Sequence, residues 1–113
     1  MFLKLPIQKN EKIVEKYEMT KYRQVRGLYE INVLHNSNDN STVASFINFG
    51  DTNISVNFHN SINPFDDFLI TFGNTKFPNE VKLDELKFIG EELIILEEFI
   101  QAVKRDFENK YNR

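Results

Sequence analysis

The sequence predicts an α+β fold, in which an antiparallel meander sheet of about four to six strands packs against one long C-terminal helix. Two patterns indicate this class. Apolar and polar residues alternate along most of the first two-thirds of the chain, as in half-buried strands. In the last third, apolar residues recur at alternating steps of three and four, as in a helix. A length of 113 residues and an apolar fraction of 41% suit a single domain, residues 1–113.

The N-terminal segment Glu11–Tyr22 fits two kinds of structure. Ile13 and Tyr17 would share one face of a helix, but together with Met19 they also fit an alternating strand. We favour the strand.

Three strands with short connections follow. Residues 23–35 alternate between apolar and polar side chains, and residues 42–49 resume the alternation after Asn36–Ser41, which is a turn by composition. After a second turn at residues 50–53, residues 54–59 alternate cleanly. Strands joined by such short turns predict a meander.

The stretch before the helix is less regular. Asn60–Asp67 contains a proline and predicts a loop, whereas Phe68–Phe72 predicts another strand. Gly73-Asn74 fits a two-residue hairpin turn. Pro78 interrupts the return, which is either a short edge strand or the lead-in to the helix, with Asp84 as its expected N-cap.

The C-terminal helix is predicted over about residues 84–109 and carries two apolar stripes. The first stripe follows a heptad pattern: Leu86, Ile89, Leu93, Leu96, Ile100, Val103 and Phe107. The second lies beside it and consists of Phe88, Ile95 and Phe99. We expect both to cover the sheet. The alternative is that Phe88, Ile95 and Phe99 bind a protein partner or a second copy of the chain, so that the helix mediates a homo-oligomer.

Charge is distributed unevenly although the net charge is only -3. Residues 1–26 carry seven Lys or Arg against three Glu, whereas residues 27–80 carry one Lys against six acids. This pattern disfavours a general nucleic-acid surface, which spreads positive charge along a face. Tyr22, Arg23 and Arg26 form a basic and aromatic cluster, and they are the candidate site for a small anionic, nucleotide-like ligand.

The two histidines are the remaining candidates for chemistry. His35 and His59 end the first and third meander strands, and an imidazole suits general-base catalysis or metal binding. Strand parity places them on opposite faces, so we predict no metal site. No nucleophile elbow or phosphate loop occurs either, and we predict no catalytic residues and no cofactor.

Composition narrows the remaining classes. The chain has no cysteine, so disulfides and thiolate sites are excluded. No apolar run approaches membrane-spanning length and no signal peptide is evident, so a cytoplasmic location is expected. Frequent Asn, Ile, Lys and Phe, with alanine only at Ala44 and Ala102, indicate an AT-rich bacterial genome, one of its phages or a mobile element.

These observations favour a small non-catalytic protein that acts by protein–protein contact, such as an inhibitor or accessory factor. The first alternative is a binder of a small anionic ligand. The second, less favoured, is an enzyme that uses one of the two histidines.

Overall fold

The computed structural model describes residues 7–50, 53–72, 75–76 and 83–111, with side chains described within 7–50, 53–71 and 90–111. Its elements confirm the predicted α+β class. The strands are β1 (Ile7–Val14), β2 (Tyr17–Gln24), β3 (Tyr29–Asn36), β4 (Ser41–Asn48), β5 (Ile54–Phe58), β6 (Phe68–Phe72) and β7 (Thr75–Lys76). A short 3-10 helix, η1 (Pro64–Asp66), precedes β6, and the long helix α1 (Leu83–Tyr111) follows the strands.

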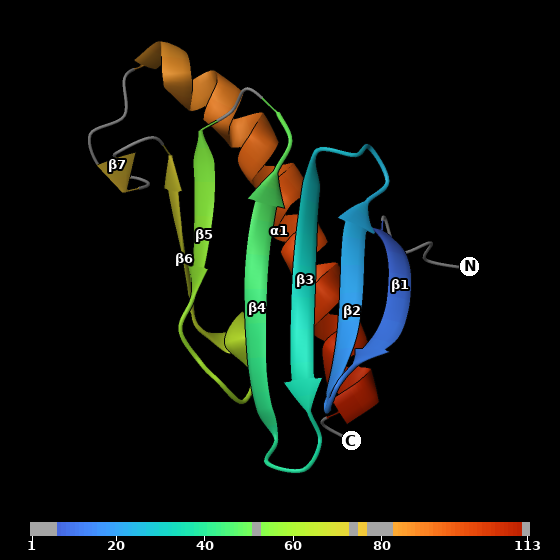
Figure 1. Cartoon of the computed structure of the whole chain (residues 1–113). Helices are drawn as coiled ribbons and strands as arrows, with labels where there is room; N and C mark the ends of the chain where they lie inside the picture. The colour runs from blue at the N-terminus through green and yellow to red at the C-terminus, as the bar shows by residue number, and fades with distance from the viewer. Residues whose placement is uncertain (1–6, 51–52, 73–74, 77–82, 112–113) are drawn as a thin grey trace.

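The strands form two antiparallel sheets. β1, β2, β3 and β4 make a four-stranded meander in chain order, and β5, β6 and β7 make a second sheet beside β4 (Figure 1). The expected meander ran through residues 54–59, but the structure corrects this because β4 and β5 belong to different sheets. The N–H of Thr42, at the start of β4, donates to the carbonyl of Ser61, so this edge of β4 bonds to the loop after β5.

Helix α1 forms the second layer. It crosses behind the sheets in Figure 1, so each sheet has one face against the helix. We call the other face of the β1–β4 sheet, which is turned towards the viewer, the open face. No part of α1 covers it in Figure 1.

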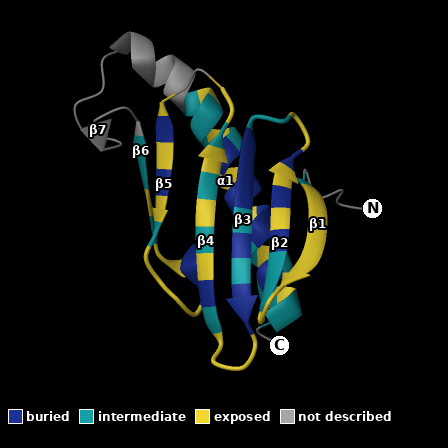
Figure 2. Ribbon diagram, in the orientation of Figure 1, coloured by how far each residue is buried: buried dark blue, intermediate teal, exposed yellow. Residues whose placement is uncertain are grey.

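The core lies between the helix and the sheets. Tyr29, Ile31 and Val33 alternate along β3 towards α1, and each is at most 1% exposed. Leu96 and Phe107 on the first helix stripe are fully buried, as are the residues between them on that stripe. Figure 2 shows the resulting contrast between the buried β3 and the exposed edge strand β1. The expectation that the helix covers the sheet is therefore confirmed.

Two strands replace the single N-terminal strand that the sequence suggested. β1 and β2 pair along their whole length around a tight turn at Glu15 and Lys16. Glu15 adopts a φ of 57°, which is uncommon for a residue other than glycine, so its identity gave no turn signal.

The predicted strand over residues 23–35 is also corrected. A turn at Val25–Leu28 divides it, with the Gly27 N–H donating to the Gln24 carbonyl at 2.8 Å. Gly27 has a φ of 74°, a conformation that glycine adopts readily. The helix-facing residues are even-numbered in β2, as at Tyr22, and odd-numbered in β3, as at its partner Ile31. Val25 and Gly27 of the turn continue the odd-numbered series of β3 in the sequence, so the break was invisible to the pattern.

Some predicted features lie outside the described residues. These are the Gly73-Asn74 turn, the Pro78 interruption and the side chains of four predicted helix residues: Asp84, Leu86, Phe88 and Ile89. The backbone of α1 begins at Leu83 and ends at Tyr111, close to the predicted bounds.

Candidate functional site

The residues predicted to bind an anionic ligand lie on different surfaces. Tyr22 is fully buried against α1, and its hydroxyl donates to Asp106 Oδ2 at 2.7 Å. Arg23 is the next residue of β2 and lies exposed on the open face, while Arg26 is exposed in the turn after β2. Strand alternation thus separates the tyrosine from both arginines.

Tyr22 belongs to a polar link between the sheet and the helix. Burial, followed by the hydrogen bond to Asp106, raises the pKa of Tyr22 above its ordinary value. Lys9 contacts both carboxylate oxygens of Asp106 at 3.1 Å. The tyrosine is therefore a neutral donor in a satisfied network, and these contacts anchor α1 on β1 and β2.

Of the helix residues predicted to bind a partner, Ile95 and Phe99 face the sheet. Phe99 is fully buried, with its ring 6.4 Å from that of Tyr29, and Ile95 is half-buried against the core. The side chain of Phe88 lies outside the described residues. Among the described side chains of α1, the large apolar one that is exposed is Ile94, at 60%. Its exposed neighbours on the outer surface of α1 are the acidic residues Glu91, Glu97 and Glu98.

The two histidines lie in different environments, one buried and one exposed. His35 is buried, with Nδ1 2.7 Å from Thr42 Oγ1 and its ring centroid 3.8 Å from that of Tyr111. Burial lowers the pKa of His35, which favours the neutral imidazole in this position. His59 follows β5 and is exposed. Within residues 7–50, 53–71 and 90–111, no group of three His, Asp or Glu residues is placed to hold a metal ion.

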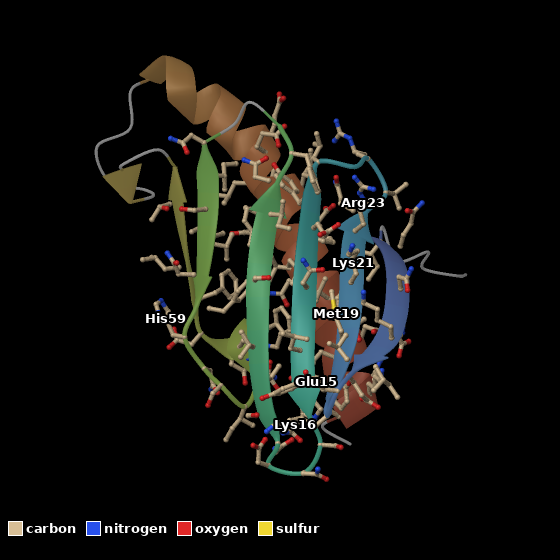
Figure 3. The ribbon with its side chains drawn as sticks, viewed as in Figure 1. Glu15, Lys16, Met19, Lys21, Arg23 and His59 are labelled. Carbon is tan, nitrogen blue, oxygen red and sulfur yellow. The ribbon has the colours of Figure 1, made fainter. Side chains whose placement is uncertain are left out.

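The open face has an ordered composition. The register of the four strands aligns its central residues in three rows across the sheet. The rows are Lys12-Met19-Leu34-Val43, Asn10-Lys21-Asn32-Ser45 and Gln8-Arg23-Glu30-Ile47. In the first row, Leu34 and Val43 form an apolar band on β3 and β4. The bases of the three rows, Lys12, Lys21 and Arg23, belong to β1 and β2. Figure 3 shows Met19, Lys21 and Arg23 following one another along β2 on this face.

Charge on the open face is one-sided. Lys12, Lys21 and Arg23 are exposed there, whereas the only acid that β1–β4 place on this face is Glu30. Glu30 is 7% exposed and accepts a hydrogen bond from Asn32 Nδ2 at 3.1 Å. The accessible charge of this face is therefore positive.

The lysines of the two faces differ in their partners. Towards the helix, Lys9 pairs with Asp106, and Lys110 pairs with Glu11. On the open face, Lys12 and Lys21 have no carboxylate of the described residues within ion-pair distance. The acids of β1 and β2 are Glu11 and Glu18, and strand alternation places both on the helix side of the sheet.

Apolar side chains continue the open face towards the β4 end. Val43 is 62% exposed and Ile47 is 37% exposed. Phe49 is 49% exposed just beyond β4, and the Arg23 guanidinium lies over its ring at 5.0 Å from the centroid. This stacking holds one base of the face in a defined position.

A hollow of about 70 Å³ lies on the β1–β2 half of the open face. It is lined by Asn10, Lys12, Met19 and Lys21. In the register, Lys12 is opposite Met19 and Asn10 is opposite Lys21, so the two lysines occupy diagonal corners of the hollow. The hollow is larger than the roughly 15 Å³ that one water needs.

Comparison with known proteins gives no relatives. No family model, no curated protein and no solved structure matches the chain. Within the described residues, no helix has an apolar stretch long enough to cross a membrane.

The open-face residues were not identified from the sequence. Lys12 and Lys21 are nine positions apart, and only the pairing of β1 with β2 brings them together. Nothing in the sequence signalled this pairing, because Glu15-Lys16 is not among the dipeptides that mark a two-residue hairpin turn. Arg23 was expected to act together with Tyr22, whereas it lies on the opposite face of β2.

Proposed function

We propose that this chain is a non-catalytic protein-binding domain, and that it docks an acidic protein partner on its open face. The observation that carries the proposal is the combination of unpaired bases and exposed apolar side chains on one uncovered sheet face. Sheet faces that remain uncovered usually carry polar residues, so exposed Val43 and Ile47 on this face call for an explanation.

Charge complementarity argues for the acidic partner. Lys12, Lys21 and Arg23 are exposed, and no carboxylate of the described residues forms an ion pair with them. Glu30, which lies opposite Arg23 in the register, is 7% exposed. A partner surface with carboxylates opposite these bases and apolar side chains opposite Val43 would satisfy both halves of the face.

A protein is favoured over nucleic acid because of what the face lacks. Binding of single strands relies on aromatic side chains on which several bases stack. The central rows of the open face hold no aromatic residue. Tyr17, at the start of β2, and Phe49, beyond the end of β4, lie at opposite ends of the face. Each ring is already covered by a cation, Lys16 or Arg23 respectively.

The test is site-specific photo-cross-linking in the cells that encode the protein. A benzophenone amino acid is placed at Val43, the test position on the open face. The control position is Ile94 on the outer surface of α1, because the two side chains are almost equally exposed, at 62% and 60%. We expect an adduct with an acidic protein from position 43, and its yield should fall when Arg23 is replaced by Gln.

Three results would contradict the proposal. One is an adduct from position 94 with none from position 43. The second is an adduct of twice the mass of the chain from position 43, because the face would then bind a second copy. The third is a nucleic-acid adduct at that position.

A further inference from the structure

The open-face hollow is a defined site within the proposed contact surface. Its four lining residues come from two adjacent strands, and each projects to the same side of a regular antiparallel pair. The positions of Lys12 and Lys21 are therefore fixed at their backbone ends by the β1–β2 ladder. Only the flexible ends of the two side chains remain to be ordered when a ligand binds.

The lining has the chemistry of an anion site. Lys12 and Lys21 each supply an ammonium group with three N–H donors, and Asn10 supplies an amide with two further donors. Met19 forms an apolar wall between them. Donors on two sides and a thioether wall suit an anionic group carried on a short aliphatic stem.

The acids of β1 and β2 form no ion pair with the lysines of the hollow. Glu11 and Glu18 belong to the helix side of the sheet by strand alternation, and they line a neighbouring hollow that Lys12 and Met19 also reach. Glu11 pairs there with Lys110, and Glu18 accepts the hydroxyl of Tyr111 at 2.6 Å. Neither carboxylate lies within ion-pair distance of Lys12 or Lys21.

We propose that this hollow is a carboxylate-binding site, in which Lys12, Lys21 and Asn10 hold a glutamate or aspartate side chain of the partner while Met19 contacts its methylene groups. The proposal rests on the proposed function, since it locates where the acidic partner is recognised. Each lysine would donate a charge-assisted hydrogen bond to the carboxylate. The apolar band from Leu34 to Val43 would bind the adjoining apolar residues of the partner.

The experiment titrates the isotopically labelled full chain with an oligo-glutamate peptide and follows its amide NMR signals. We expect the largest shifts at Asn10, Lys12, Met19 and Lys21. Replacing both lysines by glutamine should weaken binding on the order of tenfold, which corresponds to about two surface ion pairs.

The matched control replaces Lys16 and Arg26 by glutamine. Both are exposed bases outside the hollow, and the change in net charge is the same. We expect this control to weaken binding less than threefold, about the effect of reduced long-range attraction. Equal weakening by the two double variants, or a larger effect in the control, would overturn the proposal.

Two further probes distinguish the source of the anion. Inorganic phosphate and an oligothymidylate are titrated under the same conditions, and each should shift the four amides less than oligo-glutamate does at equal anionic charge. Stronger binding of either probe at the hollow would assign the site to phosphate groups and overturn the carboxylate assignment.

The outcome also separates this proposal from the proposed function. If cross-linking from Val43 persists while the double variant of Lys12 and Lys21 binds as the control does, the open face is the contact surface but the hollow is not its carboxylate site. If cross-linking from Val43 fails, the proposed function fails whatever the NMR titration shows.

Discussion

At the residue scale, His35 illustrates how burial decides the protonation of a side chain. It is 2% exposed, and its ring lies against Tyr111 and near Phe107, with ring centroids 5.8 Å apart in the latter pair. Burial lowers its pKa; the negative charges of Glu18 and Asp39 oppose this shift, and Lys110 adds to it. A neutral histidine in contact with Thr42 is thus part of the core.

This burial predicts a pH dependence of stability. Because the folded-state pKa of His35 lies below its ordinary value of 6.5, the unfolded chain binds the proton first as the pH falls. The contribution of His35 to stability is therefore complete above pH 6.5, and it is lost progressively as the pH falls from there towards the folded-state pKa.

The measurement is urea unfolding between pH 5 and 8 for wild type, His35→Gln and His59→Gln. We expect His35→Gln to flatten the fall in free energy of unfolding below pH 6.5, and His59→Gln, a change at an exposed position, to retain it. If the free energy of unfolding of His35→Gln fell with pH as steeply as that of the wild type, other groups would be the cause of the pH dependence.

At the element scale, replacing each of two glycines by alanine should change the stability of the protein in opposite directions. Gly27 lies in the β2–β3 turn with φ at 74°, whereas Gly90 lies within α1. A Cβ added at either position would meet no atom within 4 Å, so backbone conformation alone distinguishes them.

We expect Gly27→Ala to destabilise the protein by about 1–2 kcal/mol, because an alanine resists the left-handed conformation. Gly90→Ala should stabilise it by about 0.5–1 kcal/mol, because alanine favours the helix. Chemical denaturation of the two variants checks both signs. Destabilisation by Gly90→Ala would mean that α1 requires glycine for a reason other than space.

The elements also show what sequence patterns can predict. The helix was predictable within two residues because its stripes recur over about six turns, and Leu96 and Phe107 are buried as the pattern required. The turn at Val25–Leu28 was not, because Val25 and Gly27 happen to continue the alternating series of β3 in the sequence, although the facing parity changes across the turn. The separation of β4 from β5 was not predictable either, since it depends on the contact of Thr42 with the loop after β5.

The candidate site was less predictable than the fold. The sequence indicated that bases cluster near the N-terminus, and it grouped Arg23 with Tyr22 and Arg26 as one candidate site. It did not indicate that Lys12 and Lys21 would line one hollow, because this depends on the register of β1 with β2. A pattern along one strand determines which face a residue occupies, but its neighbours on that face come from pairing.

At the scale of the whole molecule, one aromatic side chain joins the layers. Phe107 of α1 is fully buried, and its ring lies 5.7 Å from that of Phe65 in η1 and 5.8 Å from that of His35 in β3. It therefore contacts the four-stranded sheet and the segment that connects β5 to β6.

We expect Phe107→Ala to lower the free energy of unfolding by about 3–5 kcal/mol, through lost burial and an unfilled cavity. Ile94→Ala, which shortens an exposed side chain of the same helix, should change it by less than about 0.5 kcal/mol. Thermal melts followed by circular dichroism measure both variants. Similar small effects in the two would show that the layers are joined elsewhere.

The adjacent positions Tyr22 and Arg23 have a consequence for how this protein can diverge. One side chain packs in the core and the next lies on the open face, so alternate positions of the eight-residue strand β2 are under different selective constraints. Natural variants should retain Thr20 and Tyr22 to preserve folding, while Lys21 and Arg23 change as the partner changes. A lineage can therefore acquire a new binding specificity through alternate codons of one strand without altering the interior.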